Sequence, residues 1–296
     1  MSKTIPRSDL TPAAINGVEL CVQTFGGAAD AAIVLIGGAA AAMDYWEDDF
    51  CEELAAGKRF VIRYDARDTG GSTHYKPGAP SYTVRDLMLD VLGVAGHFQL
   101  ARVHLAGISM GATLALLAAL EQPKRMASLT LLSTSPGGPG GPDSPNPDLP
   151  PISEKLAAFF AADSDELTDW TDRASSLDRL IADERLFAGT HPYDEAARRA
   201  LLGRIFDRTQ NMASSAINHW KLESGTTRLR PQLKALDIPT LIFHGSEDPL
   251  FPIGHGRALA QELPRARLIE LPGVGHEYPP RPLWPRIIPA ILEHTS

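Results

Sequence analysis

The sequence predicts an α/β fold in which a mostly parallel central sheet is flanked by helices and carries an inserted helical cap. In the first half of the chain, short apolar runs alternate with helical patterns, which is typical of βαβ units and a parallel sheet. A stretch dominated by Pro and Gly, residues 136–151, interrupts this alternation. Strand-like runs return only at Thr240, after a long helical segment.

The elements of the first half follow from hydrophobic periodicity. Strands are predicted at residues 18–23, 32–36, 60–64, 103–106 and 129–132. Helices are predicted at residues 46–54, 83–98 and 110–120. Thr83 followed three residues later by Asp86 resembles a capping box, with the shorter acid in place of Glu.

Beyond the Pro- and Gly-rich stretch the chain is helical and amphipathic until the strand pattern resumes. Two groups of apolar side chains each share one face of a predicted helix. The first group is Leu156, Phe159 and Phe160, and the second is Leu201, Leu202, Ile205 and Phe206. Strands then follow at 240–243 and 266–271, with helices at 256–263 and 284–294. We therefore assign residues 1–135 and 235–296 to one core and residues 136–234 to a cap or lid.

Composition narrows the choice of partners and compartment. The chain has 296 residues and a formal net charge of −8, so its surface repels nucleic acid and anionic membrane surfaces. The apolar run at 31–43 is interrupted by glycines and is shorter than the roughly 18 residues of a membrane span. Cys21 and Cys51 match no metal-ligand spacing, and we interpret them as reduced thiols of a cytoplasmic protein. The polar start of the chain does not resemble a signal peptide.

The sequence Gly107-Ile108-Ser109-Met110-Gly111 matches the G-x-S-x-G pattern between a predicted strand and a predicted helix. A tight turn of this kind forces the serine into strained dihedrals, and side chains two positions away on either side would collide. The turn also places the serine hydroxyl beside a helix N-terminus, which favours an oxyanion. A chance match is the alternative, but the strand before it and the helix after it favour Ser109 as a nucleophile.

A serine nucleophile needs a base, and in this arrangement an acid and then a histidine follow it along the chain. Asp248 comes shortly after the predicted strand at 240–243, and His276 lies in a glycine-flanked loop after the last strand. Glu247 competes with Asp248 for the role of the acid. His244 and His255 are the alternatives to His276 because they lie near the same sheet end. The remaining candidates, which are interpreted as structural or exposed, are His97, His104, His219 and His294.

Stabilising the oxyanion of an acyl transfer requires preorganised N–H donors. The backbone amide of Met110, directly after the nucleophile, is one predicted donor. The other is expected from the loop after the strand at 32–36, where Gly38 or Ala39 is available. An ordinary strand-ending turn would explain Gly37-Gly38 equally well if the serine motif were absent.

These motifs resemble the α/β-hydrolase superfamily over nearly the full length of the chain. Many members carry the pattern YDxRGxGxS after the fourth strand, and residues 64–72 follow it except that Asp68 replaces the first glycine. With Gly-Ile-Ser-Met-Gly-Ala at 107–112 and Pro-Gly-Val-Gly-His at 272–276, the sequence looks most like the aclacinomycin methylesterase group. Those are bacterial enzymes that hydrolyse a methyl ester on an anthracycline.

The resemblance implies an α/β-hydrolase fold, a Ser109–His276–Asp248 triad, and an oxyanion loop at 36–39. Most relatives have His-Gly in that loop, whereas this chain has Ile36-Gly37-Gly38-Ala39. If the loop is aligned with the pattern of the aclacinomycin methylesterase group, the second donor is Gly38. If it is aligned by counting from Trp46, the second donor is Ala39. Asp65 and Arg67 are expected to fix loops beneath the site.

The predicted reaction is ester hydrolysis through an acyl-enzyme, with no metal or organic cofactor. The same triad also supports cleavage of a C–C bond, a lactone or an amide, or cofactor-free perhydrolysis. A non-catalytic ligand-binding protein of the same fold is the alternative outside catalysis.

Trp46 and Met110 are the predicted pocket residues because they flank the oxyanion loop and the nucleophile. Aromatic residues of the cap either line the same pocket or pack the cap helices; they are Phe159, Phe160, Trp170 and Phe187. The substrate is expected to be a small-molecule ester, and the sequence leaves its identity and the oligomeric state open.

Overall fold

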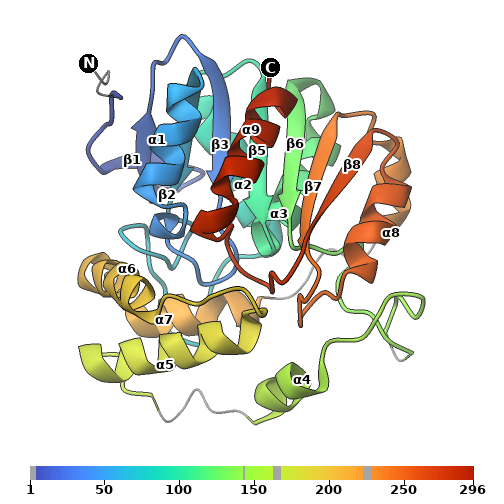
Figure 1. Cartoon of the computed structure of the whole chain (residues 1–296). Helices are drawn as coiled ribbons and strands as arrows, with labels where there is room; N and C mark the ends of the chain where they lie inside the picture. Colours follow the sequence, from blue (N-terminus) through green and yellow to red (C-terminus); the bar gives the residue numbers. More distant parts are fainter. Residues whose placement is uncertain (1–4, 143, 163–167, 223–228) are drawn as a thin grey trace.

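The computed structural model describes residues 5–142, 144–162, 168–222 and 229–296. Its centre is an eight-stranded sheet in the order β1-β2-β4-β3-β5-β6-β7-β8 (Figure 1). The strands are β1 (Thr11–Ile15), β2 (Val18–Phe25), β3 (Ala31–Ile36), β4 (Arg59–Tyr64), β5 (Val103–Ile108), β6 (Met126–Leu132), β7 (Thr240–Gly245) and β8 (Ala266–Leu271). From β4 to β8 along this order all neighbours are parallel, so the predicted mostly parallel sheet is confirmed.

The sequence prediction omitted β1, which forms an antiparallel hairpin with β2. Only Ala13 and Ile15 of this strand are buried, so its apolar pattern is weak. Asn16 and Gly17 join the two strands with φ of 48° and 78°. An Asn-Gly pair is a strong sequence signal for a hairpin turn. This pair is therefore the feature of the sequence that indicates a strand before Val18.

Helices cover both faces of the sheet. They are α1 (Asp48–Ala56), α2 (Val84–His97), α3 (Met110–Glu121), α8 (Gly254–Glu262) and α9 (Trp284–His294). Thr83 caps α2 through a reciprocal pair of bonds with Asp86, which confirms the predicted capping box. Helices α2, α3 and α8 pack on one face of the sheet, and α1 and α9 pack on the other.

Between β6 and β7 the chain forms further helices, which lie together along one edge of the sheet, away from both chain ends (Figure 1). They are α4 (Glu154–Ala161), α5 (Arg173–Phe187), α6 (Glu195–Arg208) and α7 (Met212–Ile217). Each begins at a side chain that accepts a bond from the first turn, namely Ser153, Asp172, Asp194 and Asn211. The cap boundaries at residues 136 and 234 stay a prediction.

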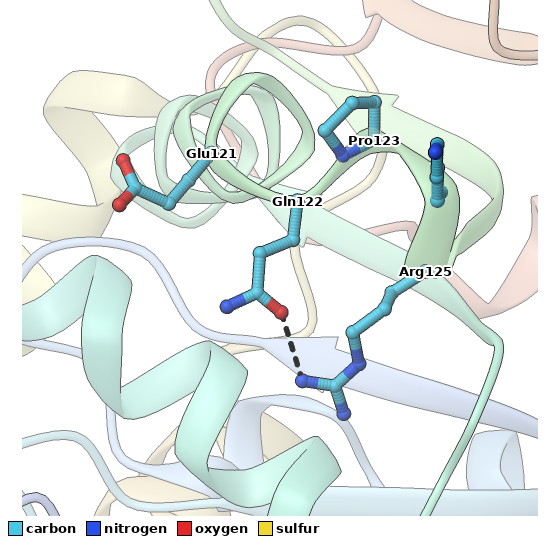
Figure 2. Close-up of a pocket in the computed structure, with 5 residues that line it drawn as sticks. Glu121, Gln122, Pro123 and Arg125 are labelled. Atoms are coloured by element: carbon cyan, nitrogen blue, oxygen red, sulfur yellow. Dashed lines mark hydrogen bonds between the residues drawn. The ribbon is translucent and has the colours of Figure 1, made fainter.

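The C-terminal end of α3, at Glu121, lies near the start of β6. This is the edge of the sheet at which the parallel strands begin. A hollow of about 330 Å³ is present there, lined by consecutive residues from Glu121 to Arg125 (Figure 2). Arg125 donates to the side chain of Gln122 at 3.0 Å across it. None of the predicted catalytic residues lies in this hollow.

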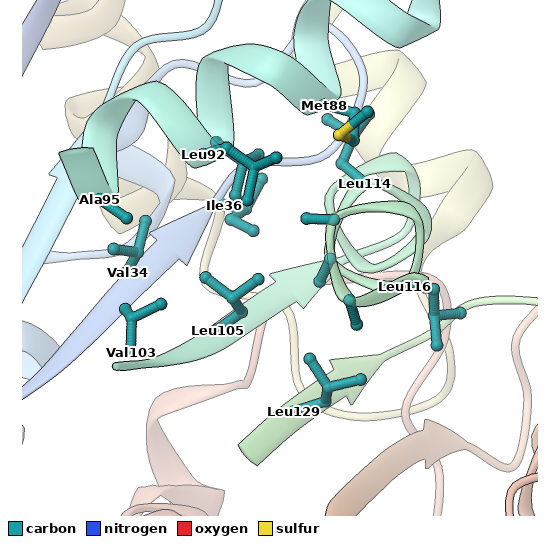
Figure 3. Close-up of a cluster of buried hydrophobic side chains, with 14 of the residues drawn as sticks. Val34, Ile36, Met88, Leu92, Ala95, Val103, Leu105, Leu114, Leu116 and Leu129 are labelled. Carbon is teal, nitrogen blue, oxygen red and sulfur yellow. The ribbon is translucent and has the colours of Figure 1, made fainter. Parts of the chain in front are cut away.

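The buried core follows from strand alternation, since successive side chains point to opposite faces of a sheet. Val34 and Ile36 of β3 point toward α2 and α3, while Ile33 and Leu35 point toward α1 and α9. Figure 3 shows the first of these layers, where Leu105 of β5 lies beneath the helices. Both faces are covered, which explains why these strands are continuously apolar.

Buried histidines predict that the fold loses stability in mild acid. Burial, with a contribution from the nearby charge of Arg59, lowers the pKa of His104 to about 4. Burial also lowers the pKa of His219, His244, His255 and His294. Below the ordinary histidine pKa the unfolded chain binds protons that the folded chain does not, so stability falls as pH drops from about 7 to about 5.5.

We expect the urea midpoint to fall steadily over that interval, above the range in which most carboxyl groups titrate. His104→Gln removes one titrating group at the amino end of β5, and its pH slope should be shallower than that of the unmodified protein. A midpoint that stays level or rises on acidification to pH 5.5 would contradict this prediction.

Candidate active site

Ser109 occupies the turn between β5 and α3, with φ of 54° and ψ of −120°. This strained backbone is what the glycines on either side of the serine permit. A methyl group on Gly107 would lie 2.4 Å from the backbone of Gly111, and one on Gly111 would lie 2.5 Å from the carbonyl oxygens of Ile36 and Gly37. The turn predicted from the sequence pattern is therefore present, and glycine at both positions has a steric reason.

The loops after β7 and β8 bring an acid and a histidine to the serine. His276 Nδ1 lies 2.8 Å from Asp248 Oδ2, and His276 Nε2 lies 2.9 Å from Ser109 Oγ. Asp248 Oδ1 accepts from the amides of Leu250 and Phe251, which fixes the carboxylate. The three side chains predicted from distant parts of the sequence thus form one continuous hydrogen-bonded chain.

The charge on Asp248 sets the direction of the hydrogen bonds. Burial alone raises the pKa of this carboxyl, but the neighbouring His276 lowers it through charge and hydrogen bonding, and the net direction is downward. Asp248 is therefore ionised and accepts a hydrogen bond from the N–H at His276 Nδ1. That leaves Nε2 as the acceptor for the Ser109 hydroxyl, which is the arrangement required of a general base.

The competing residues have other partners. Glu247 accepts from the amide and hydroxyl of Thr190, in the loop between α5 and α6. His244 donates to the carbonyl of Phe251 at 2.6 Å, and His255 bonds Ser135 and a backbone carbonyl. The structure therefore places Asp248 and His276, and not these alternatives, beside Ser109.

The predicted oxyanion donors lie next to Ser109. Met110 is the first residue of α3, where helix geometry leaves the amide without an intrahelical acceptor. A methyl group on Gly38 would lie 3.6 Å from Cβ of Ser109, so the loop after β3 lies against this serine. The Gly38 amide, however, donates to the hydroxyl of Tyr278 at 3.0 Å. Ala39 is in the same loop and faces the same cavity as Ser109.

A buried histidine from the cap holds this loop. His219 Nδ1 accepts from the amide of Ala40 at 2.8 Å, and Nε2 bonds the carbonyl of Arg67 at 2.8 Å. An amide only donates and a carbonyl only accepts, so the ring is neutral with its proton on Nε2. Burial lowers the pKa of His219, in agreement with this assignment. A structural or exposed position was expected for His219, and its bond to the loop could not be predicted because the two segments are 179 residues apart in the sequence.

Residues 63–72 fix the floor of the site, as expected. Asp65 accepts from the amides of Met43 and Gly71 and pairs with Arg208 of α6 at 2.5 Å. Asp68 has φ of 66°, a left-handed conformation that suits glycine and that aspartate tolerates. This explains why aspartate can replace the glycine of the family pattern at this position.

A cavity of about 840 Å³ opens at Ser109 and His276 and extends under the cap. The aromatic cap residues considered for a pocket contribute to its wall, namely Phe159, Phe160, Trp170 and Phe187. Neither Trp46 nor Met110, the two predicted pocket residues, lines this cavity. Trp46 lies in the core instead. It is 1% exposed and packs against Phe50 and Tyr278, whereas the preceding residue, Tyr45, faces the cavity.

Comparison with known proteins identifies the family of this chain. A family profile described as the alpha/beta hydrolase fold matches residues 31–278. This chain belongs to the α/β-hydrolase family. The matched span runs from the start of β3 to Tyr278 and so includes the serine turn, the acid loop and the histidine loop.

The similarity of this α/β-hydrolase to bacterial methylesterases is also confirmed. It is 31% identical over 292 residues to rhodomycin D methylesterase of Streptomyces sp. strain C5, covering 94% of this chain and 95% of that protein. It is 30% identical to rhodomycin D methylesterase of Streptomyces peucetius, with the same coverage. The enol-lactonase of Burkholderia xenovorans LB400 superposes with a TM-score of 0.74 at 22% identity over 96% of this chain and 99% of that one, which shows a shared fold.

Two features are absent from the described parts of this α/β-hydrolase. Among the described residues, no group of three or more His, Cys, Asp or Glu side chains is arranged to hold a metal ion. No helix there has the length and apolar character needed to cross a bilayer.

The serine turn of this α/β-hydrolase gives a test of its packing. We expect Gly111→Ala to lower the free energy of unfolding by several kcal/mol, since the new methyl group would meet two backbone carbonyls that cannot move aside independently. Gly96→Ala is the matched control, because a methyl group there meets nothing within 4 Å and helix propensity favours alanine by up to about 1 kcal/mol. Urea denaturation of both variants measures the difference. Equal stability of the two would show that the close approach at Gly111 is not a constraint.

Proposed function

We propose that this α/β-hydrolase is a serine esterase that cleaves the methyl ester of a bulky carboxylic acid through an acyl-enzyme. The observation that carries the proposal is His276, whose ring bonds Asp248 at 2.8 Å on one side and Ser109 at 2.9 Å on the other. This arrangement lets a weak hydroxyl nucleophile lose its proton as it attacks.

In the first step His276 Nε2 takes the Ser109 proton while Oγ bonds the ester carbonyl carbon. The carbonyl electron pair moves to oxygen, and the oxyanion is stabilised by the amide of Met110 and by a second donor that the loop at Gly38 and Ala39 either supplies or positions. The tetrahedral intermediate collapses, the bond to the alkoxy oxygen breaks, and the imidazolium returns its proton to the leaving alcohol. Asp248 stabilises the imidazolium while it exists.

In the second step a water molecule takes the place of the alcohol. His276 removes a proton from the water, the hydroxide oxygen bonds the acyl carbon, and the ester bond to Ser109 breaks with return of the proton to Oγ. The products are a carboxylic acid and an alcohol, and the enzyme is regenerated. This sequence requires no metal or organic cofactor.

Two observations support a bulky acyl group. The cavity of about 840 Å³ is walled by aromatic side chains of the cap, and the two relatives named above are methylesterases named for rhodomycin D. In this proposal residues 136–234 recognise the acid portion, and the methoxy group leaves from the catalytic end. We also propose a cytoplasmic location, because Cys21 and Cys51 match no disulfide framework.

Ser109→Ala is expected to lower kcat for a p-nitrophenyl ester by about 10⁴-fold or more and to abolish the chromophore burst. The same change should prevent labelling by a fluorophosphonate.

Asp248→Asn should lower kcat by about 10⁴-fold, since the amide no longer stabilises the imidazolium. Ser81→Ala, an exposed serine outside the cavity, is the control and should match the unmodified enzyme. Absence of both hydrolysis and labelling in the unmodified enzyme would refute the esterase proposal.

A series of methyl esters of increasing acid size tests the substrate class. We expect kcat/KM to rise with acid size, roughly fourfold for each methylene that becomes buried at about 0.8 kcal/mol. Ala216→Phe narrows the cavity wall and should reduce kcat/KM for the largest ester far more than for methyl acetate. Ala196→Phe adds the same side chain on α6 at a position that does not line the cavity, and should change neither. Faster turnover of a lactone or of a C–C bond substrate than of every methyl ester would exclude the methylesterase assignment.

A further inference from the structure

Tyr278 lies two residues after the catalytic histidine, and its hydroxyl engages the predicted oxyanion loop. The hydroxyl oxygen accepts from the Gly38 amide at 3.0 Å. Tyr278 faces the same cavity as Gly38 and Ser109. Since Gly38 lies against the side chain of Ser109, the hydroxyl is at the edge of the space in which a substrate carbonyl oxygen would become charged.

The position of this hydroxyl is fixed by packing of its ring. Tyr45 stacks on the ring with centroids 5.1 Å apart and planes 25° apart. Trp46 packs edge-on with centroids 5.1 Å apart and planes 82° apart. Arg198 lies over the ring of Tyr45 at 5.2 Å. A ring held on two sides has little freedom to turn, so its hydroxyl is preorganised.

The direction of the hydrogen bond determines what the hydroxyl can do next. A phenol has one proton to donate and can also accept. Because the amide can only donate, the bond from Gly38 uses an acceptor site of the oxygen and leaves its proton for another partner. The Gly38 N–H already donates its hydrogen bond to Tyr278, so it does not donate directly to a substrate oxyanion.

We propose that the Tyr278 hydroxyl is the catalytic group that donates to the oxyanion, with the Gly38 amide behind it as a positioning donor. The inference rests on the esterase function proposed above. The oxyanion then receives one hydrogen bond from the Met110 amide and one from the phenol. The phenol retains its proton throughout, so no bond other than those of the acyl transfer forms or breaks.

Two properties suit the phenol to this task. Accepting from Gly38 polarises the O–H bond and strengthens its donation, as in other hydrogen-bond chains. Burial raises the pKa of Tyr278, although Gly38 and Arg198 act in the opposite direction. The hydroxyl therefore remains protonated over the pH range in which a histidine base operates.

Tyr278→Phe tests the proposal because it removes one oxygen and keeps the stacked ring. We expect kcat for a methyl or p-nitrophenyl ester to fall at least tenfold and up to about 10³-fold, with KM changed much less, since the lost bond forms in the transition state. The affinity for a trifluoromethyl ketone, which adds to the serine and carries an oxyanion, should fall by the same factor as kcat/KM. The urea midpoint establishes that the variant is folded.

Tyr75→Phe is the matched control, since its hydroxyl contacts Arg67 at 3.3 Å and lies outside the cavity. It should leave kcat, KM and the ketone affinity unchanged. The proposal is overturned if Tyr278→Phe retains more than a tenth of the unmodified kcat, or if kcat rises, which would mean that the hydroxyl blocks the oxyanion site. The Tyr278 variants are compared only after the unmodified enzyme has been shown to hydrolyse esters and to be labelled at Ser109 by a fluorophosphonate. A failure of the proposed esterase function is thereby distinguished from a failure of the proposed role of Tyr278.

Discussion

The site depends on one backbone contact, the approach of the first turn of α3 to the loop after β3. At Gly111 the chain comes so close to the carbonyls of Ile36 and Gly37 that a methyl group would lie 2.5 Å from each. This approach brings the amide of Met110 and the loop that carries Gly38 close together beside Ser109. A side chain at position 111 would push the two segments apart, and the amide and the loop would no longer lie close to each other.

A second set of contacts ties the cap to the same loops. The amide of His276 donates to the carbonyl of Phe187 at the end of α5, at 2.7 Å. Arg208 of α6 pairs with Asp65, and His219 holds the amide of Ala40. The elements that surround the cavity therefore also hold His276 and the loop after β3. Changes in the predicted cap should therefore alter the geometry around Ser109 as well as the shape of the cavity.

Much of this arrangement was predictable from the sequence, for identifiable physical reasons. Parallel strands end at the same edge of a sheet, so Ser109, Asp248 and His276, each following a strand, were expected to converge. Glycines at positions 107 and 111 predicted the strained turn because few residues permit such a close approach. The strand at Thr11–Ile15 was missed because only its hairpin turn, and not its apolar pattern, carried a signal.

Sequence patterns fail where a single residue step decides which way a side chain faces. Residues Met43–Tyr45 form a 3-10 turn, in which successive side chains rotate by about 120° around the axis. Tyr45 consequently faces the cavity while Trp46 turns into the core beside Phe50, so the prediction that Trp46 lines the pocket is wrong. The buried indole nevertheless packs on the ring of Tyr278 and holds the hydroxyl beside Gly38. Trp46 therefore does not line the cavity, but it packs against a ring that does.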